Sequence, residues 1–319
     1  MERILITGSL GQLGTELVPE LQNKFGIDQV FATDVHTPIH HKFEGHFSTL
    51  DVLDINSIKN FIKTNRITQI YHLAAILSAN AEKSPALAWR INMDGLINVL
   101  ETAKEYKIQK VFWPSSIAVF GTDTPKDNTP QNTLMNPNTI YGITKVAGEK
   151  LCAYYNEKND MDIRSLRYPG LIGHQSLPGG GTTDYAVEIF HEAIQKGTFI
   201  SPLASDTALP MMFMPDAIRA TIELMDADRN KLTIKSSYNL AGISFSPEQI
   251  AQSIQKYFPD FIITYKPDFR QKIAASWPNS IDDAIARKDW KWKVAYNLDD
   301  MTSEMIRHLK MMKQPAGVY

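Results

Sequence analysis

A tyrosine and a lysine four residues apart form a pair that could move a proton. Tyr141 and Lys145 occur in YGITK, at the start of a segment with helical spacing, and residues four apart lie on one face of a helix. A lysine beside a phenol favours the phenolate by charge, so Tyr141 could act as a base near neutral pH. Ser116, 25 residues earlier in WPSSIAVFG, could hold the oxygen of an alcohol or carbonyl beside the tyrosine, and Ser115 is its neighbour.

The same spacing also occurs at Tyr106 and Lys110. That pair runs from a predicted helix into a predicted strand, so its two side chains are not expected on one helix face. Tyr141 instead opens a predicted helix after the strand that ends in the serines. The sequence therefore favours Tyr141 and Lys145 as the chemical pair.

A glycine-rich turn near the start predicts a nucleotide site. Gly8, Gly11 and Gly14 follow an apolar strand-like run with the spacing G-x-x-G-x-x-G. In such a turn one glycine makes the bend, the next lets phosphate approach the backbone, and the third allows helix and strand to pack closely. The following helix would then present its N-terminus to a pyrophosphate. Alone, the glycines are equally compatible with a turn that binds nothing.

Asp34 strengthens the nucleotide interpretation. It follows Gly14 by 20 residues, at the end of the second strand-like run, where an acid can bond both ribose hydroxyls. An acid there repels a 2′-phosphate and no arginine follows in TDVHT, so NAD is predicted rather than NADP. The competing interpretation is a strand-end turn residue. Asp51 could reach the adenine amino group, and the remaining residues expected along the cofactor are Gln12, Leu13, Val35, Val52, Leu73, Ala74 and Ala75.

The elements that must position these residues alternate along the first 170 residues. Short apolar runs at Arg3–Thr7, Gln29–Thr33, Gln69–Ala75, Lys110–Ser116 and Asp162–Tyr168 are predicted strands, and Gln12–Phe25, Asn56–Asn65, Pro85–Tyr106 and Tyr141–Glu157 are predicted helices. Near-continuous apolar runs are typical of parallel strands covered on both faces. The alternation predicts an α/β fold, a doubly wound parallel sheet of the Rossmann type.

After Tyr168 the alternation loosens, and a smaller C-terminal α/β lobe is expected. We expect residues 1–171 to form the dinucleotide-binding domain, completed by parts of 203–240, and residues 172–202 and 241–319 to form a substrate lobe. Its predicted elements are helices at Tyr185–Lys196, from Pro215, from Ser246-Pro247 and at Leu298–Met312, and strands at Ser237–Leu240 and Phe261–Tyr265. A serine cap followed by proline is a typical helix start.

Composition excludes several classes of function. The 319 residues are 43% hydrophobic with a net charge of −2, which gives no reason to expect a nucleic acid or membrane partner. The absence of an apolar run near ~20 residues, and of a leader-like start, predicts a cytoplasmic protein. Cys152 is the only cysteine and the histidines of HTPIHHKFEGHF are irregularly spaced, so neither a disulfide within the chain nor a metal site is expected.

Taken in order, the motifs resemble the extended branch of the short-chain dehydrogenase/reductase superfamily. The matching features are the glycine turn, Asp34, HLAA, WRINMDGLINVLE, SSIAVFG and YGITKVAGE. The resemblance implies NAD as cofactor and Ser116, Tyr141 and Lys145 as catalytic residues. It also implies that Tyr141 and Lys145 contact the cofactor, together with Asn92, Tyr168 and Leu171. A homodimer that pairs the helices at Pro85–Tyr106 and Tyr141–Glu157 is a further implication.

Within this branch the second half is similar to the short-chain type of L-threonine 3-dehydrogenase. PGGGTTDYAVEIFHEAI, PMMFMPDAIRATIELM and SWPNSIDDAIARKDWKWK carry that similarity. It implies L-threonine as substrate and 2-amino-3-ketobutyrate as product. The alternatives are a sugar-nucleotide epimerase or dehydratase, and an NAD-binding regulator without catalysis.

A small amino acid needs a small pocket with a few polar anchors. Gly180, Thr182 and Thr183 lie in LPGGGTTD, interpreted as a lid over the site, with an ordinary surface loop as the alternative. Ser78 follows the fourth strand and is either a substrate contact or a helix cap, and Trp277 is either a pocket wall or a core residue. The expected substrate contacts are these five residues with Ser115, Ser116 and Tyr141.

Overall fold

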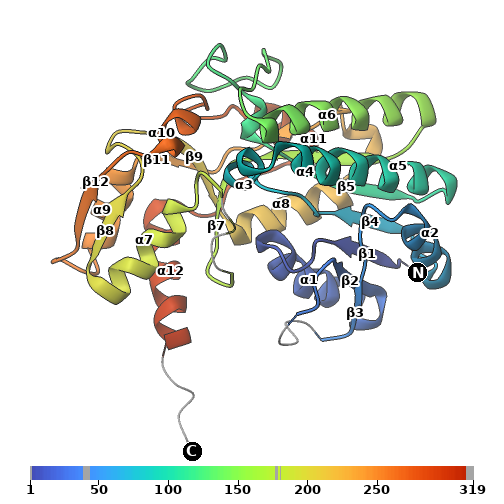
Figure 1. The fold of residues 1–319 in the computed structure, drawn as a ribbon, viewed down its shortest axis with the longest axis horizontal. Coiled ribbons are helices and arrows are strands. Elements are labelled where there is room, and N and C mark those ends of the chain that lie inside the picture. Colours follow the sequence, from blue (N-terminus) through green and yellow to red (C-terminus); the bar gives the residue numbers. More distant parts are fainter. Residues whose placement is uncertain (1, 39–43, 177–178, 180, 314–319) are drawn as a thin grey trace, which may run out of the picture.

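A parallel sheet of seven strands forms the centre of the protein (Figure 1). The computed structural model describes residues 2–38, 44–176, 179 and 181–313. The order across the sheet is β10-β6-β5-β4-β1-β2-β3, with β1 at Ile4–Thr7, β2 at Val30–Asp34, β3 at His46–Thr49, β4 at Gln69–His72, β5 at Lys110–Ser116, β6 at Ile163–Tyr168 and β10 at Tyr238–Asn239. Every residue of β1, β2, β4 and β6 is buried, as continuous apolar runs require. The predicted Rossmann-type sheet is confirmed.

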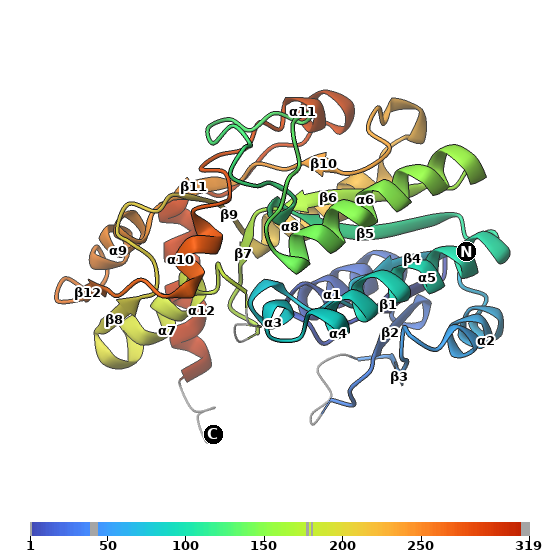
Figure 2. The same ribbon diagram turned by 45° about the horizontal axis from the view of Figure 1, so that its top comes forward.

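Helices cover both faces of this sheet. On one face lie α1 (Gln12–Phe25), α8 (Met214–Asp226) and α11 (Ala284–Trp290), whose apolar residues share a core with β1, β2 and β6. On the other lie α2 (Ile55–Asn65), α5 (Gly95–Glu105) and α6 (Ile140–Asn159), with the opposite side chains of the same strands. Figure 2 shows α5 and α6 running side by side over the strands. Burial on both sides fixes where the strand ends lie.

The strand order of the sheet reverses between β1 and β4. Strands β1, β2 and β3 are laid down to one side, and α2 then carries the chain to β4 on the other side of β1. The register places Thr7 beside both Thr33 and His72. In open α/β sheets the crevice at such a point, outside the carboxyl ends of the strands, is where ligands bind.

Two predicted elements differ from the structure. The helix expected over Pro85–Tyr106 consists of α4 (Pro85–Trp89), a π-helical turn η2 (Arg90–Asp94) and α5. The turn contains Asn92, whose side chain bonds the backbone of Ile76, and π turns often mark such functional interruptions. The strand expected to reach Ala75 ends at His72, and a short helix α3 (Ser78–Lys83) follows.

The C-terminal lobe contains two small sheets. Strands β7 (Gly170–Ile172), β9 (Leu209–Phe213) and β11 (Ile243–Phe245) form one, and β8 (Thr198–Ser201) and β12 (Ile262–Tyr265) the other. They pack with α7 (Tyr185–Lys196), α9 (Pro247–Gln255), α10 (Phe269–Ala274) and α12 (Leu298–Lys313) around a separate apolar core. Among the described residues, the 3₁₀ turns are η1 (Ile27–Gln29), η3 (Ile117–Val119) and η4 (Arg229–Lys231). Figure 1 shows this lobe beside the parallel sheet.

The sequence predicts only some of the helices and strands in the second half of the chain. Ser246 caps α9 and Gln249 returns the bond, so the predicted helix start is a complete capping box. Strand β10 joins the main sheet at the edge of β6, about 70 residues further along the chain.

Within the described part of the chain, no helix has the length and apolarity needed to span a membrane.

Candidate active site

One cavity of about 680 Å³ opens at the carboxyl ends of the parallel strands. At one end it is lined by the glycine turn and Asp34, and at the other by Ser116, Tyr141 and Lys145. Its volume lies within the ~300–1,000 Å³ of ordinary ligand pockets. A single cavity therefore joins the predicted nucleotide site to the predicted chemical site.

The three glycines of the turn serve different needs. Gly8 has a φ of +69°, and a Cβ there would lie 2.6 Å from the Ala74 nitrogen; a Cβ at Gly14 would lie 2.6 Å from the Ser9 Cα. At both positions the neighbouring backbone leaves no room for a side chain. A Cβ on Gly11 would meet only the Gly8 oxygen, at 3.3 Å, and Gly11 lines the cavity. Its missing side chain leaves the room that a ligand would fill.

The start of α1 faces this space. Gly11 is the N-cap and has no side chain to bond the first-turn amides of the helix. Those amides lack acceptors within the helix and carry the positive end of its dipole. This is the arrangement that binds a phosphate group in dinucleotide folds.

Asp34 ends β2 at the rim of the same space. Its Oδ2 accepts a hydrogen bond from the Leu10 amide and its Oδ1 from the His36 amide, both at 3.1 Å. These two bonds fix the carboxylate, and each oxygen keeps a lone pair for a further donor such as a ribose hydroxyl. Gly11, the helix start and Asp34 thus form a donor and acceptor set that fits a dinucleotide.

Nearly all residues expected along the cofactor line this cavity. They are Gly8, Gly11, Gln12, Leu13, Gly14, Asp34, Val35, Asp51, Val52, Leu73, Ala74, Ala75, Tyr141, Lys145, Tyr168 and Leu171. Asn92 is not among the lining residues. Its side chain accepts from the Ile76 amide at 2.8 Å and donates to the Ile76 oxygen at 3.2 Å. Asn92 therefore supports the cavity wall from behind.

Several lining residues are not predicted from the sequence. They are His36, Leu50, Leu53, Ile76, Leu77, Leu87, Ile91, Pro114, Ile117, Gly181 and Asp184. Most adjoin a predicted residue along the chain, and that adjacency is the signal that could have found them. Leu87 and Ile91 are different, because their four-residue spacing is equally typical of ordinary core packing.

The predicted chemical residues meet at the other end of the cavity. Tyr141 stands in the first turn of α6, whose N-cap Thr139 accepts the Gly142 amide at 3.1 Å. The Ser116 side chain lies close enough to the phenol to lower its pKa, and its oxygen accepts the Ala118 amide at 3.2 Å. Lys145 Nζ lies 5.4 Å from the centre of the Tyr141 ring and donates to the Pro114 oxygen at 2.6 Å.

Burial dominates the electrostatics of this cluster. It raises the pKa of Tyr141 to about 12, although Ser116 acts in the opposite direction. Burial also lowers the pKa of Lys145 to about 7, with Cys152 and Glu149 acting against it. Both groups are held towards their neutral forms. Burial thus opposes the charge effect expected of Lys145, and the role of Tyr141 as a base near neutral pH stays a prediction.

The expected substrate contacts fall into two groups. Ser78, Ser115, Ser116, Tyr141, Thr183 and Trp277 line the cavity, whereas Thr182 lies behind its wall. The Ser78 side chain accepts the Thr182 amide at 3.2 Å and bonds its hydroxyl at 3.3 Å. The Ser115 hydroxyl donates to Glu149 at 2.6 Å. Gly180, the remaining predicted contact, lies outside the described residues.

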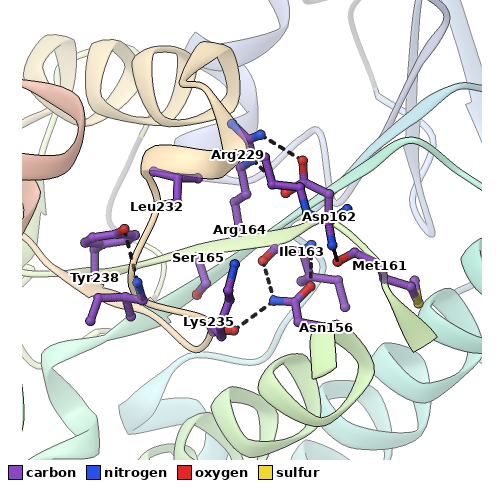
Figure 3. A pocket seen from close by; sticks show the side chains of 11 residues that line it. Asn156, Met161, Asp162, Ile163, Arg164, Ser165, Arg229, Leu232, Lys235 and Tyr238 are labelled. Atoms are coloured by element: carbon purple, nitrogen blue, oxygen red, sulfur yellow. Dashed lines mark hydrogen bonds and ion pairs between the residues drawn. The ribbon is translucent and has the colours of Figure 1, made fainter. Parts of the chain in front are cut away.

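A second cavity lies at the opposite, amino-terminal end of β6 (Figure 3). It measures only about 20 Å³, room for about a single water. Arg164 at its wall is bonded to Asp162 and to the carbonyls that end α8. This cavity is too small for a substrate or a dinucleotide. Nor do three or more His, Cys, Asp or Glu side chains come together to suit a metal ion anywhere in the described structure.

The fold and the site together define an NAD-dependent enzyme of the extended short-chain dehydrogenase/reductase class. The chain belongs to the NAD dependent epimerase/dehydratase family, whose model matches residues 4–241. It is 49% identical over 317 residues to an uncharacterized epimerase/dehydratase of Staphylococcus haemolyticus, covering 98% of this chain and 99% of the relative.

Solved structures give a closer comparison. The holo form of a GalE-like L-threonine dehydrogenase from Cupriavidus necator is 50% identical, with a TM-score of 0.94 and coverage of 96% of this chain and 99% of that one. A monomeric L-threonine 3-dehydrogenase from a metagenome, in its apo form, is also 50% identical, with a TM-score of 0.94 and coverage of 98% and 100%. The predicted family and the predicted cofactor, NAD, are both confirmed.

Proposed function

We propose that this protein oxidises the 3-hydroxyl of L-threonine to 2-amino-3-ketobutyrate, with NAD as the oxidant. The observation that carries the proposal is the placement of Ser116, Tyr141 and Lys145 in the same cavity as the NAD cradle. The similarity to L-threonine dehydrogenases over nearly the whole chain supports the choice of substrate.

The chain's own residues supply the acid–base part of the reaction. Ser116 holds the hydroxyl oxygen of the substrate beside Tyr141, since both side chains line the same end of the cavity and Ser116 lies close enough to act on the pKa of the phenol. Tyr141 takes the hydroxyl proton, and Lys145, when charged, stabilises the phenolate. NAD, which Gly11, the start of α1 and Asp34 would hold, would supply the acceptor for the hydride that leaves C3.

The substrate end of the cavity suits a small amino acid. Asp184 lines it and is 5% exposed, so its carboxylate can oppose an ammonium group with little screening by water. Ser78 and Thr183 add hydroxyl groups, and the 5%-exposed Trp277 forms an apolar wall. In this proposal these residues bind the amino group of the substrate and leave no room for a large substituent at C3.

The same lining argues against a sugar nucleotide. Such a substrate carries a diphosphate of its own, which proteins usually bind with arginine. Among the described residues that line the cavity there is no arginine. Arg219, Arg229, Arg270 and Arg287 are instead paired with acids elsewhere.

The test is to incubate the purified protein with NAD and L-threonine and follow absorbance at the NADH band. We expect a steady rise with L-threonine and none with a UDP-sugar. Turnover of a UDP-sugar without net release of NADH would overturn the proposal in favour of an epimerase. NAD binding without turnover of either substrate would indicate a regulator.

We also propose that the protein forms a homodimer through the face made by α4, α5 and α6. Five large apolar side chains on these helices are exposed, Leu87 by 45%, Trp89 by 42%, Ile97 by 40%, Ile143 by 43% and Tyr154 by 55%. Apolar residues gathered on neighbouring helices are typical of an interface. Light scattering on an Ile143→Glu variant should report the monomer mass, and a wild-type monomer would refute the dimer.

A further inference from the structure

Glu149 is the third residue on the catalytic face of α6. Tyr141, Lys145 and Glu149 are spaced by four and so point to one side of the helix. Glu149 is 0% exposed, and its Oε1 accepts the Ser115 hydroxyl at 2.6 Å. A buried carboxylate is costly unless it is paired and hydrogen-bonded. Its partners therefore show what it is used for.

Arg167, on the neighbouring strand β6, neutralises this carboxylate. Its Nε donates to Glu149 Oε1 and its Nη2 to Oε2, both at 2.8 Å. Arg167 lies opposite Ser115 in the register of β5 and β6, just as Tyr168 lies opposite Ser116. Because a two-point guanidinium–carboxylate pair fixes both distance and plane, it clamps α6 to the carboxyl ends of β5 and β6.

The remaining donor group of Arg167 extends this clamp towards the second lobe. Its Nη1 donates to the Gln131 oxygen at 2.9 Å and to Asn239 Oδ1 at 3.0 Å. Asn239 in turn donates to the Thr129 oxygen at 3.0 Å and to the Asp282 oxygen at 3.1 Å. The network therefore joins the segments around 129–131 and 282 to the catalytic strands.

Those two segments hold the wall of the substrate end. Thr129 pairs with Ile281 as an isolated bridge. Lys126 Nζ donates to the Trp277 oxygen at 2.9 Å and to the Ala275 oxygen at 2.8 Å. Trp277 thus reaches the cavity on a turn whose backbone is tied to the Glu149–Arg167 pair.

We propose that Glu149 is a positioning residue for the oxidation. Through Ser115 it fixes the neighbouring Ser116 against Tyr141, and through Arg167 it anchors the segments that carry Trp277. Ser116 and Tyr141 come from different elements, β5 and α6, so their separation depends on what joins those elements. The Glu149–Ser115 bond is a side-chain link between them one residue away from Ser116.

This inference rests on the proposed function, and its test uses a double-mutant cycle on the full chain. The variants are Ser115→Ala, Glu149→Gln and both together, each assayed with NAD and L-threonine. Ser165→Ala is the matched control, because this buried β6 serine bonds Ser237 and does not line the active cavity.

We expect a loss in kcat rather than in NAD binding. Because misplacement of a reacting group by ~1 Å costs about a hundredfold in rate, Ser115→Ala should lower kcat about tenfold and Glu149→Gln about tenfold to a hundredfold. The KM for NAD should change less than about twofold. The double variant should resemble Glu149→Gln, since two residues that act through one contact are not additive.

Ser115→Ala keeps the ion pair, so it tests the inference even if Glu149→Gln does not fold. If the wild type is active and the kcat of Ser115→Ala lies within twofold of the wild-type value, the positioning role of Glu149 is overturned. The proposed function then still stands. The role of Glu149 is also overturned if the fold loss in kcat of the double variant equals the product of the two single losses, because Ser115 would then act on substrate directly. A wild type that does not oxidise L-threonine overturns the proposed function and this inference together.

Discussion

The two ends of the active cavity are built on opposite principles. The nucleotide end is formed by backbone and by missing side chains: Gly8, Gly11 and Gly14 around the start of α1, with one carboxylate, Asp34. The reacting end is formed by buried side chains, with Lys145 at 3% and Glu149 at 0% exposure. The nucleotide end makes room for a ligand by lacking side chains, and the reacting end buries ionisable side chains away from water.

This difference separates binding from turnover. A change at the nucleotide end should act on the fit of the cofactor and on the hydrogen-bonding groups that would hold it, the first-turn amides of α1 and Asp34. A change at the reacting end alters protonation, since burial sets the pKa values of both Tyr141 and Lys145. Substitutions at the two ends should therefore change different measured quantities.

The largest effect is expected for Tyr141→Phe, which removes the hydroxyl and keeps the ring. A general base contributes about 10²–10⁴ in rate, so kcat should fall by about that factor while the Kd for NAD stays within about twofold. Tyr106→Phe is the matched control, as this half-buried residue ends α5 away from the cavity. Turnover that survives in Tyr141→Phe would mean that another group is the base.

Gly11→Ala should show the reverse pattern. Its Cβ would enter the cavity with only one close neighbour, so overpacking should weaken NAD binding about tenfold, or ~1.4 kcal/mol. The Tm without NAD should fall only slightly, because Ala is a poorer N-cap than Gly and its Cβ would lie 3.3 Å from the Gly8 oxygen. In the companion variant Gly14→Ala the Cβ meets the Ser9 backbone, and the Tm should fall. Equal NAD affinity in Gly11→Ala and wild type would remove Gly11 from the cradle.

Lys145→Met tests whether burial of the charge is costly. The pKa of Lys145 is about 7 in the folded protein and 10.5 as its ordinary value, so the unfolded chain binds more protons between these values. Stability from this group therefore rises with pH from about 7 to about 10.5 and is lowest below that window. The Tm of the variant should exceed that of wild type at pH 7 by about 2–4 °C per kcal/mol relieved.

The gap between the two melting temperatures should then narrow as the pH approaches 10. Thermal unfolding of both proteins without NAD, followed by circular dichroism across this range, measures it. A gap that does not change with pH would show that Lys145 is not held out of water at a cost.

Asp51→Ala should have the smallest effect. Asp51 lines the nucleotide end but is exposed, and an exposed hydrogen bond contributes about 0.5–1 kcal/mol. NAD affinity should fall about two- to fivefold, measured by titration. Asp54→Ala is the control: Asp54 caps α2 through the Asn56 and Ser57 amides, so it should lower the Tm and leave NAD affinity unchanged. A loss beyond tenfold in Asp51→Ala would place it among the main anchors.

The same contrast explains what the sequence could predict. The strands, the glycine turn and Asp34 follow from local rules, since burial on both faces and tight turns leave a pattern in neighbouring residues. Tyr141 and Lys145 follow from helical spacing. Asn92 was placed on the cofactor, whereas it supports Ile76 from behind the wall; only the fold shows which way a π turn directs a side chain.

Other features depend on residues that are distant in the chain. Strands β7 and β11 have three residues each and are defined by their partner β9, so no local period announces them. The raised pKa of Tyr141 comes from burial, which depends on the packing of the whole site. Glu149 ends the motif YGITKVAGE, but its role could not be predicted from that motif, because its partners Ser115 and Arg167 lie on two other elements.

The late arrival of β10 has a bearing on biosynthesis. Strand β6 is complete at Tyr168, but its outer edge is covered only when Tyr238 and Asn239 pair with Leu166 and Arg167. Until the ribosome has released those residues, the nascent chain presents an open strand edge, a template for aggregation. Arg167 likewise lacks the Asn239 acceptor during this interval. A fragment that stops at residue 171 should therefore be a poor folding unit, and a chaperone that shields β6 should raise the yield of the full chain.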